Sequence, residues 1–217
     1  MRDGVLRQRS VEPGTNLRIV VLAAGKRACI GVDLASGAFV RAHQSGAGGR
    51  RLLPFDVAEG IVGVERVERP EHPESVDVES PLTAVGRLSG WRLDRLLRPL
   101  AHPAGRPLLG FHGSSIPSWQ LDGDRPSLAL LDIGTGFTVT VDASGVRCQF
   151  FWNGLPQSVR FEDPTLLSRL DWLPHNPLRG QALDQVLGFT PQRLVLALSR
   201  PVHGHCYKVA AAALPRG

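Results

Sequence analysis

Lysine, cysteine and long apolar runs are all scarce in this chain of 217 residues. Only Lys26 and Lys208 are lysines, and every other basic residue is an arginine. The cysteines, Cys29, Cys148 and Cys206, are too few and too odd in number for a disulfide framework. Each lies within an apolar run, so we expect buried thiols in a reducing cytoplasm. No run of eighteen apolar residues is present, which argues against a transmembrane helix.

The N-terminal segment and the net charge give weaker signals. Residues 1–16 are polar and lack the apolar stretch of a secretory signal, so the sequence predicts a loose arm there. The formal net charge of +5 favours an anionic partner. Because the preference for arginine, with abundant Ala, Gly and Pro, is typical of a GC-rich genome, the charge shifts this expectation only modestly.

Recognisable catalytic and metal-binding motifs are absent. The chain has no GxxxxGK[ST], GxGxxG or GxSxG sequence, and its acidic residues form no cluster of the kind that metal-dependent nucleases need. His203, His205 and Cys206 are potential metal ligands, but a strand would direct His205 and Cys206 to opposite faces. We therefore expect a protein that is not an enzyme and that uses no metal or cofactor.

The sequence is rich in short β-type runs separated by turn residues. These runs predict strands at residues 17–23, 28–34, 38–44, 61–68, 127–133, 136–142, 146–152, 157–162, 193–199 and 205–213. Ala35-Ser36-Gly37 and Ala143-Ser144-Gly145 each predict a tight hairpin between two of them. Leucines at helical spacing predict a helix over 89–98, and Asp163-Pro164 begins a second candidate over 164–172.

This pattern predicts a mostly β protein made of two small barrels packed together, with one or two short helices in the connectors. Prolines at 99, 103 and 107 end the first predicted helix and indicate a connector. The expected organisation is a flexible arm over residues 1–16, a first barrel with its connector helix over 17–104, and a second barrel over 105–217.

Alternation along the predicted strands suggests which side chains face solvent. On strand 38–44, Phe39, Arg41 and His43 share one face, which combines an aromatic ring with polar and cationic groups. On strand 146–152, Arg147, Gln149 and Phe151 face outward if Val146, Cys148, Phe150 and Trp152 form the core. Arg160 faces outward on strand 157–162. The alternative is that Phe39 and Phe151 pack against the other barrel or a connector.

Four stretches are similar to the bacterial dual OB-containing domain family, in order and in spacing. They are RIVVLAAGKRACIGVDLASGAFVRA (18–42), LLPFDVAEGIVGVERVERPEHPESVDVE (52–79), VRCQFFWNGLPQSVRFEDP (146–164) and LALSRPVHGHCYKVAAAAL (196–214). The chain departs from the family pattern at Phe39, Trp152 and Glu162, where the family has Trp, Tyr and Thr.

The resemblance implies two OB-like barrels, a fold whose open β-face and loops commonly hold single-stranded nucleic acid. It also implies a bacterial setting in mobile-element or antiviral defence systems, and no catalytic residues. The function that we expect is an accessory subunit that binds single-stranded DNA or RNA, or a guide–target hybrid, within a larger effector complex. The residues expected to make the contacts are Lys26, Arg27, Phe39, Arg41, His43, Arg147, Phe151, Arg160, Tyr207 and Lys208.

Two alternatives stay open. Lys26-Arg27 lies in a turn between strands, and a charged turn can be merely solvated. The chain can also be a docking subunit that binds a protein and never contacts nucleic acid. Trp119, in the segment SIPSWQL, would be an interface anchor in that case, although it can equally belong to the core.

Overall fold

The computed structural model describes residues 11–25, 28–44, 51–64, 69–134, 136–142, 145–170 and 177–216. Strands predominate among them and the helices are few and short, which confirms the predicted mostly β class. The helices of these described ranges are all too short or too polar to cross a membrane. The part of the predicted arm before residue 11, the basic turn at Lys26-Arg27 and the Ala143-Ser144 turn lie outside the described residues.

The chain divides into two compact units. The first extends to Leu96 and also includes the segment Leu121–Ser127, while the second consists of Leu97–Gln120 and Leu128–Gly217. The chain therefore passes between the units more than once.

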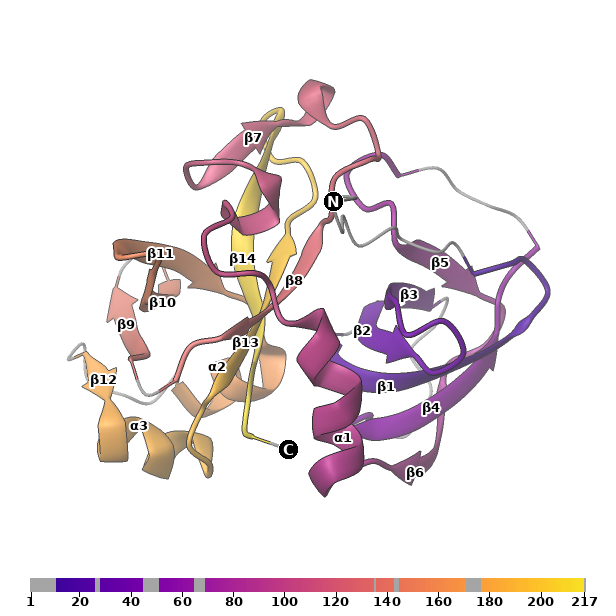
Figure 1. Ribbon diagram of the computed structural model, residues 1–217, viewed down its shortest axis with the longest axis horizontal. Coiled ribbons are helices and arrows are strands. Elements are labelled where there is room, and N and C mark those ends of the chain that lie inside the picture. Colours follow the sequence, from indigo (N-terminus) through magenta and orange to yellow (C-terminus); the bar gives the residue numbers. More distant parts are fainter. Residues whose placement is uncertain are drawn as a thin grey trace. The chain divides into compact units, whose positions relative to one another are not determined.

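The first unit is built on one sheet of six strands (Figure 1). Its strands are β1 (Asn16–Ala24), β2 (Ala28–Asp33), β3 (Phe39–Gln44), β4 (Asp56–Ile61), β5 (Ser75–Val78) and β6 (Thr83–Arg87). The strand order is β5-β3-β2-β1-β4-β6, and helix α1 (Gly90–Leu97) follows β6. Strand β1 lies between β2 and β4, both antiparallel to it, whereas β3 and β5 pair in parallel.

Hydrogen bonds also join β5 to the residues around the end of β4. Val62 and Val78 form an antiparallel bridge. The amide of Gly63 donates to the carbonyl oxygen of Asp77 at 2.7 Å, and the amide of Glu79 donates to the carbonyl oxygen of Ile61 at 3.0 Å. These contacts therefore join β5 to β4, the first and last strands of the order β5-β3-β2-β1-β4.

The core of the first unit explains two features of its sequence. Leu17, Ile19 and Val21 share one face of β1 and are fully buried in one apolar cluster, while Val20 and Leu22 on its other face are buried as well. Cys29 joins that cluster from β2. Gly31 is needed because a Cβ atom at this position would lie 2.6 Å from the carbonyl oxygen of Val20, closer than side-chain atoms approach a backbone.

The predicted hairpin at Ala35-Ser36-Gly37 is confirmed, since β2 and β3 are antiparallel neighbours across it. The Asp33 carboxylate accepts hydrogen bonds from the Ser36 amide at 2.8 Å and the Ser36 hydroxyl at 2.6 Å. Gly37 has a φ of 71°, a left-handed conformation that glycine adopts without strain. Local turn chemistry therefore determines this connection.

The second unit contains a sheet in the order β12-β9-β10-β11-β14-β13-β8, with β7 also paired to β14. The strands are β7 (Ser115–Pro117), β8 (Leu128–Asp132), β9 (Thr138–Asp142), β10 (Gly145–Trp152), β11 (Leu155–Phe161), β12 (Leu178–Arg179), β13 (Arg193–Leu198) and β14 (His205–Leu214). Helices α2 (Pro164–Leu170) and α3 (Gly180–Leu187) lie between β11 and β13 in the chain. Short 3-10 turns η1 (Arg98–Leu100), η2 (Leu108–Gly110) and η3 (Ser118–Gln120) precede β8.

The pairing pattern of the second unit repeats that of the first. Consecutive strands β8 and β9 take the place of one long strand, because β8 pairs with β13 and β9 pairs with β10, both antiparallel. Strands β11 and β14 pair in parallel, as β3 and β5 do. The two units therefore share one order of strand pairing.

Most predicted strands are found within a few residues of their expected positions, and the helix predicted over 89–98 is α1. Of the strand predicted over 61–68, Ile61 is the last residue of β4 (Asp56–Ile61), Val62 forms a single bridge, and residues 65–68 lie outside the described residues. Strands β5 and β6 were not predicted, because prolines at 70, 73 and 81 interrupt this part of the sequence. Their formation depends on pairing with β3 and β4, which are distant in the sequence.

Candidate functional site

A two-residue turn positions a polar face of the second unit. Asn153 and Gly154 have φ angles of 52° and 74° and connect β10 to β11. Asn-Gly is the preferred sequence of the hairpin turn that needs two left-handed residues. This turn sets the register, in which Trp152 pairs with Leu155 and Phe151 pairs with Pro156.

The same register places two arginines directly opposite each other, Arg147 on β10 and Arg160 on β11. Arg147 donates from Nε to the Ser158 hydroxyl at 3.0 Å and from its terminal nitrogen to the Ser158 carbonyl oxygen at 2.9 Å. Arg160 donates from Nε to Glu162 at 3.0 Å. Like charges directly opposite in a sheet are unfavourable, so this pair concentrates positive charge at a cost to stability.

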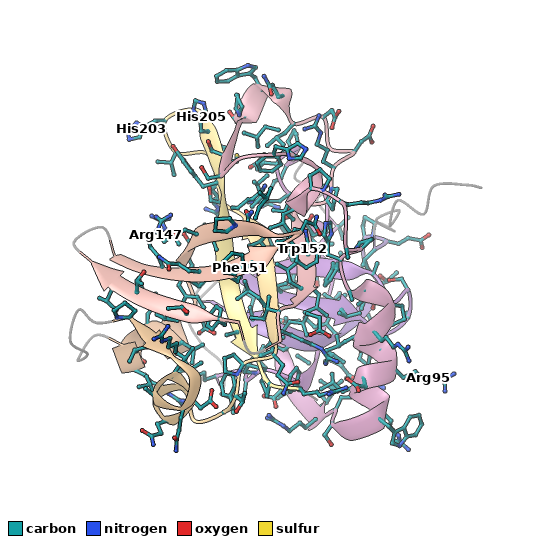
Figure 2. All side chains as sticks on the ribbon, turned by 60° about the vertical axis from the view of Figure 1, so that its left-hand side comes forward. Arg95, Arg147, Phe151, Trp152, His203 and His205 are labelled. Atoms are coloured by element: carbon teal, nitrogen blue, oxygen red, sulfur yellow. The ribbon has the colours of Figure 1, made fainter. Side chains whose placement is uncertain are left out.

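Phe151 lies on the same face and is 70% exposed. Figure 2 shows Phe151 and Arg147 on the hairpin, with Arg147 directed away from the sheet. Gln149 and Ser158 form a cross-strand pair between Phe151 and Arg147, and both are exposed. The predicted alternation of β10 is confirmed, because Val146, Cys148 and Phe150 are buried in the core while Gln149 and Phe151 are exposed.

Neighbouring strands extend this face with further polar groups. Thr140 pairs with Arg147, and Thr138 pairs with both Gln149 and Arg179. Paired residues lie on one side of a sheet, so the exposed side chain of Arg179 belongs to the same face. We call the set Thr138, Thr140, Arg147, Gln149, Phe151, Ser158, Arg160 and Arg179 the hairpin face.

Tyr207 borders the hairpin face from β14. Arg160 pairs in parallel with Val209, and Tyr207 precedes Val209 by two residues, so it lies on the same side of the sheet. Its side chain is 40% exposed. From strand spacing and rise, the Cα atoms of Phe151 and Tyr207 are about 12 Å apart. Both exposed aromatic residues therefore lie on the turn side of the arginine pair.

The turn end of the hairpin is held by the segment at residues 102–107. The indole nitrogen of Trp152 donates to the carbonyl oxygen of Arg106 at 3.1 Å, and the Gly105 amide donates to Asn153 Oδ1 at 2.9 Å. The His102 ring lies 5.7 Å from the Trp152 ring, and burial lowers the pKa of His102. Trp152, which the sequence assigns to the core, is therefore a half-buried residue that anchors this segment.

Lys208, which the sequence analysis expects to contact phosphate, lies in a buried position. It is only 5% exposed, and its Nζ donates to the carbonyl oxygens of Phe111 and Gly113 at 2.7 Å each. The nitrogen also lies 4.1 Å from the centroid of the Phe111 ring. Burial lowers the pKa of Lys208 to about 8. Lys208 therefore holds a loop through these two carbonyl oxygens.

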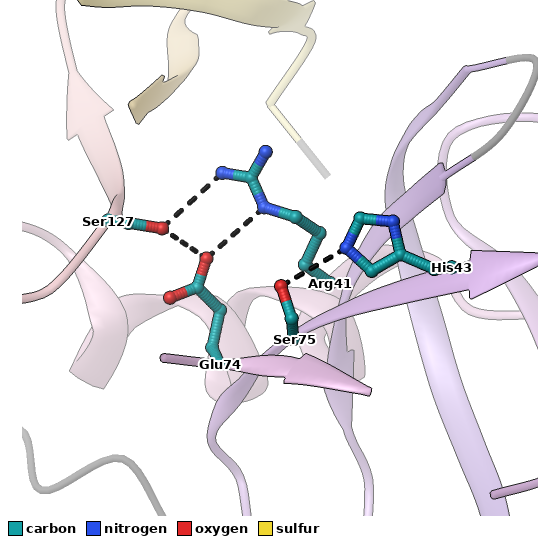
Figure 3. Close-up of polar contacts among 5 residues, drawn as sticks. All are labelled: Arg41, His43, Glu74, Ser75 and Ser127. Carbon is teal, nitrogen blue, oxygen red and sulfur yellow. Dashed lines mark hydrogen bonds and ion pairs between the residues drawn. The ribbon is translucent and has the colours of Figure 1, made fainter. Parts of the chain in front are cut away.

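The predicted binding face of β3 is also corrected. Phe39 and His43 are buried, at 9% and 8% exposure, because the outer side of β2 and β3 is covered as well as the inner side. His43 Nε2 lies 3.1 Å from the Ser75 hydroxyl (Figure 3). Alternation alone could not show this, since it distinguishes the two faces of a strand and does not show whether the second face is covered.

Arg41 belongs to a buried polar network instead of an open surface (Figure 3). Its Nε donates to Glu74 Oε1 at 3.2 Å, and a terminal nitrogen donates to the Ser127 hydroxyl at 3.4 Å. Ser127 in turn donates to Glu74, whose side chain is completely buried. Arg41 therefore neutralises a buried carboxylate within the first unit.

The other residues considered in the sequence analysis are Lys26, Arg27 and Trp119. Lys26 and Arg27 lie outside the described residues. Trp119 is 72% exposed and packs edge-on at 5.8 Å against the His205 ring, so it is not a core residue. Across the described part of the chain, histidine, cysteine and acidic side chains form no group of three that could hold a metal ion.

Sequence reasoning missed two parts of the hairpin face. The opposition of Arg147 and Arg160 could have been found, because a two-residue turn at Asn153-Gly154 fixes every pair in the hairpin. The place of Arg179 on this face could not have been found from the sequence, because β12 has only two residues and pairs with a strand about forty residues earlier.

Comparisons with known proteins add no relative. No protein-family model, no curated protein and no solved structure matches this chain.

Proposed function

We propose that this protein is a non-catalytic module that binds single-stranded nucleic acid on the hairpin face of its second unit. The observation that supports this most directly is the arginine pair, half-buried Arg147 opposite exposed Arg160, on the same face as the exposed ring of Phe151. Arginines attract the phosphate backbone, and an exposed ring offers a platform on which a base can stack.

The strand pairing supports an OB-type barrel in each unit. In an OB fold the first strand lies between the second and the fourth, and the third strand pairs in parallel with the fifth. In the first unit β1 lies between β2 and β4, and β3 is parallel to β5. In the second unit β8 and β9 together act as the first strand, and β11 is parallel to β14.

With this assignment, β10 and β11 are the second and third strands of an OB-type barrel. The face formed by these two strands is the one on which OB folds bind oligonucleotides. The hairpin face thus coincides with the expected binding surface. This agreement is independent of residue type, since it follows from backbone pairing alone.

The two units differ in the availability of that surface. On the outer side of the equivalent strands in the first unit, Ile30, Val32 and Phe39 are buried and apolar. Arginine, glutamine and an exposed phenylalanine occupy the corresponding side in the second unit. We therefore assign nucleic-acid binding to the second unit and a mainly structural role to the strands of the first.

Fluorescence anisotropy with labelled single-stranded DNA, single-stranded RNA and duplex tests the proposal. Each phosphate contact made by an arginine lowers the logarithm of the affinity by about 0.7 per tenfold increase in salt. The variant Arg147→Gln should weaken binding to a single strand and reduce that slope by about 0.7. Arg216→Gln, which changes an exposed arginine outside the hairpin face, is the matched control.

Two results would overturn the proposal. If the wild-type protein binds none of the three probes at low salt, the hairpin face is not a nucleic-acid site. If Arg147→Gln and Arg216→Gln bind with equal affinity and equal salt dependence, the arginine pair makes no phosphate contact.

A second candidate function is docking to a protein partner, and Trp119 supports it. Its indole, on η3, is 72% exposed. Tryptophan is among the residues most enriched at interface hot spots, so an exposed indole is a suitable anchor for a protein partner. Val202, in the adjacent β13–β14 connection, is also exposed. Trp119→Ala should leave affinity for oligonucleotides unchanged if this surface binds protein, and a fall in that affinity would assign Trp119 to the nucleic-acid site.

A further inference from the structure

Helix α1 of the first unit separates apolar and cationic residues onto different sides. Leu93 and Leu97, four residues apart, are completely buried. Trp91, Arg92 and Arg95 are exposed, and residues 91 and 95 are also four apart, so they lie one turn from each other. Figure 2 shows Arg95 extending away from the ribbon. The exposed side of α1 is therefore a short cationic surface with one large aromatic ring.

Trp91 and Arg92 are arranged next to each other on this surface. The Arg92 guanidinium carbon lies 5.6 Å from the centroid of the Trp91 ring, within the range of a cation–π contact. Trp91 nevertheless remains 68% exposed, so most of its ring is open to solvent. Asp94 is the acidic residue of α1, and it is half-buried and has an interaction of its own.

We propose that Trp91, Arg92 and Arg95 form a second contact site for single-stranded nucleic acid. Arg95 and Arg92 supply the charge that attracts phosphate groups, and the open face of Trp91 supplies a stacking platform. This inference rests on the proposed function, because it assigns a further contact to the same class of ligand. It names a surface that is separate in sequence from the hairpin face.

The composition of the surface favours nucleic acid over an anionic membrane. A helix that lies in a membrane interface buries a broad apolar face in the lipid. The apolar residues Leu93 and Leu97 of α1 are already buried in the protein, which leaves Trp91 as its large exposed apolar residue. One aromatic ring between cationic side chains instead matches the alternation of base and phosphate along a single strand.

The test compares Arg95→Glu with Arg216→Glu in the full-length chain. Both substitutions reverse one exposed arginine, and glutamate has a helix propensity close to that of arginine, so α1 should remain folded. The probe is a labelled thirty-nucleotide oligothymidine, with a uridine equivalent for RNA. Arg95→Glu should weaken binding at least about fivefold at 0.1 M salt and lower the salt slope by about 0.7, as loss of one phosphate contact requires.

Tryptophan emission gives a second readout. The chain has four tryptophans, and subtracting the spectrum of Trp91→Phe isolates the signal of Trp91. Stacking of a base on Trp91 should quench that signal when the oligonucleotide is added. In the variant Phe151→Ala, which changes the hairpin face, the quenching of Trp91 should still be detectable at saturating oligonucleotide, because the α1 site is intact.

The outcomes separate this inference from the proposed function. Equal affinities and slopes for Arg95→Glu and Arg216→Glu, with a loss in Phe151→Ala, would overturn the α1 site and leave the hairpin face supported. A loss in Arg95→Glu with no effect of Phe151→Ala would support α1 and overturn the hairpin face. If the protein binds anionic vesicles but neither oligonucleotide, both the α1 site and the hairpin face would be overturned as nucleic-acid sites.

Discussion

Arg147 and Arg160 lie directly opposite each other in the β10–β11 pair, on the exposed face of the hairpin. Placing two like charges at such a pair costs roughly 0.2–1 kcal/mol relative to neutral residues. Glu162 offsets part of this charge through its ion pair with Arg160, whereas Arg147 binds only the neutral groups of Ser158 in the contacts described above. An anionic ligand would relieve this repulsion, which is why we place the phosphate backbone here.

Phe151→Ala should weaken binding to single-stranded nucleic acid with little effect on folding. Stacking of one base on an aromatic side chain contributes about 1–3 kcal/mol, so the affinity should fall between about 5-fold and 150-fold. The ring is 70% exposed, so its removal creates no cavity in the core. Anisotropy titrations measure the first effect and thermal unfolding measures the second.

Leu155→Ala is the control for this prediction. Leu155 is an apolar residue of the same hairpin, is 61% exposed, and has no ring on which a base could stack. An equal loss of affinity in both variants would indicate general hydrophobic contact, and Phe151→Trp should restore or strengthen binding if stacking is the cause.

Arg41→Met should destabilise the protein strongly without changing the affinity of the folded protein for nucleic acid. It leaves the completely buried carboxylate of Glu74 without its cationic partner. Removing one member of a buried ion pair costs about 3–5 kcal/mol. Urea unfolding measures the loss, and the double variant Arg41→Met, Glu74→Gln should recover part of it. An unchanged unfolding midpoint in the single variant would contradict the buried network.

Lys208 should make stability rise with pH above neutrality. Burial lowers the pKa of its ammonium group to about 8, against 10.5 for an ordinary lysine. Between these values the unfolded chain binds more protons than the folded chain, so the free energy of unfolding increases as pH rises from about 8 to 10.5. Below pH 8 both states are protonated and this contribution is constant.

Comparing wild type with Lys208→Met across this pH range checks the assignment. The variant lacks the titrating group, so its free energy of unfolding should increase less between pH 8 and 10 than that of the wild type. It should also loosen the loop that Lys208 holds through the carbonyl oxygens of Phe111 and Gly113. Parallel pH profiles for the two proteins would show that Lys208 titrates normally.

The cysteines should resist thiol reagents in the folded protein. All three are free and buried, and burial raises the pKa values of Cys29 and Cys148 to about 12. The thiolate is the reactive form, so little of it exists at these positions near neutral pH. Labelling with a disulfide reagent should reach three thiols per chain only after denaturation. Fast labelling of the native protein would contradict the burial.

The sequence alone determined the features that depend on near neighbours. Alternation and turn residues predicted most strands, and Asp33, Ser36 and Gly37 close the β2–β3 hairpin with contacts only a few residues apart. The Asn153-Gly154 turn likewise fixes which β10 residues oppose which β11 residues. The exposure of Phe151 and the burial of Cys148 followed from the same period of two.

Which of these faces are open depends on contacts between segments that are distant in the sequence. Phe39 and Phe151 occupy similar patterns in their strands, yet Phe39 is buried and Phe151 is exposed. Lys208 and Arg147 are both cations on strands, yet Lys208 is enclosed by a loop from about ninety-five residues earlier in the chain. The parallel pairing of β14 with β11 brings Tyr207 to the hairpin face. Such contacts join distant segments, and their formation depends on the packing of the whole unit, which no local pattern encodes.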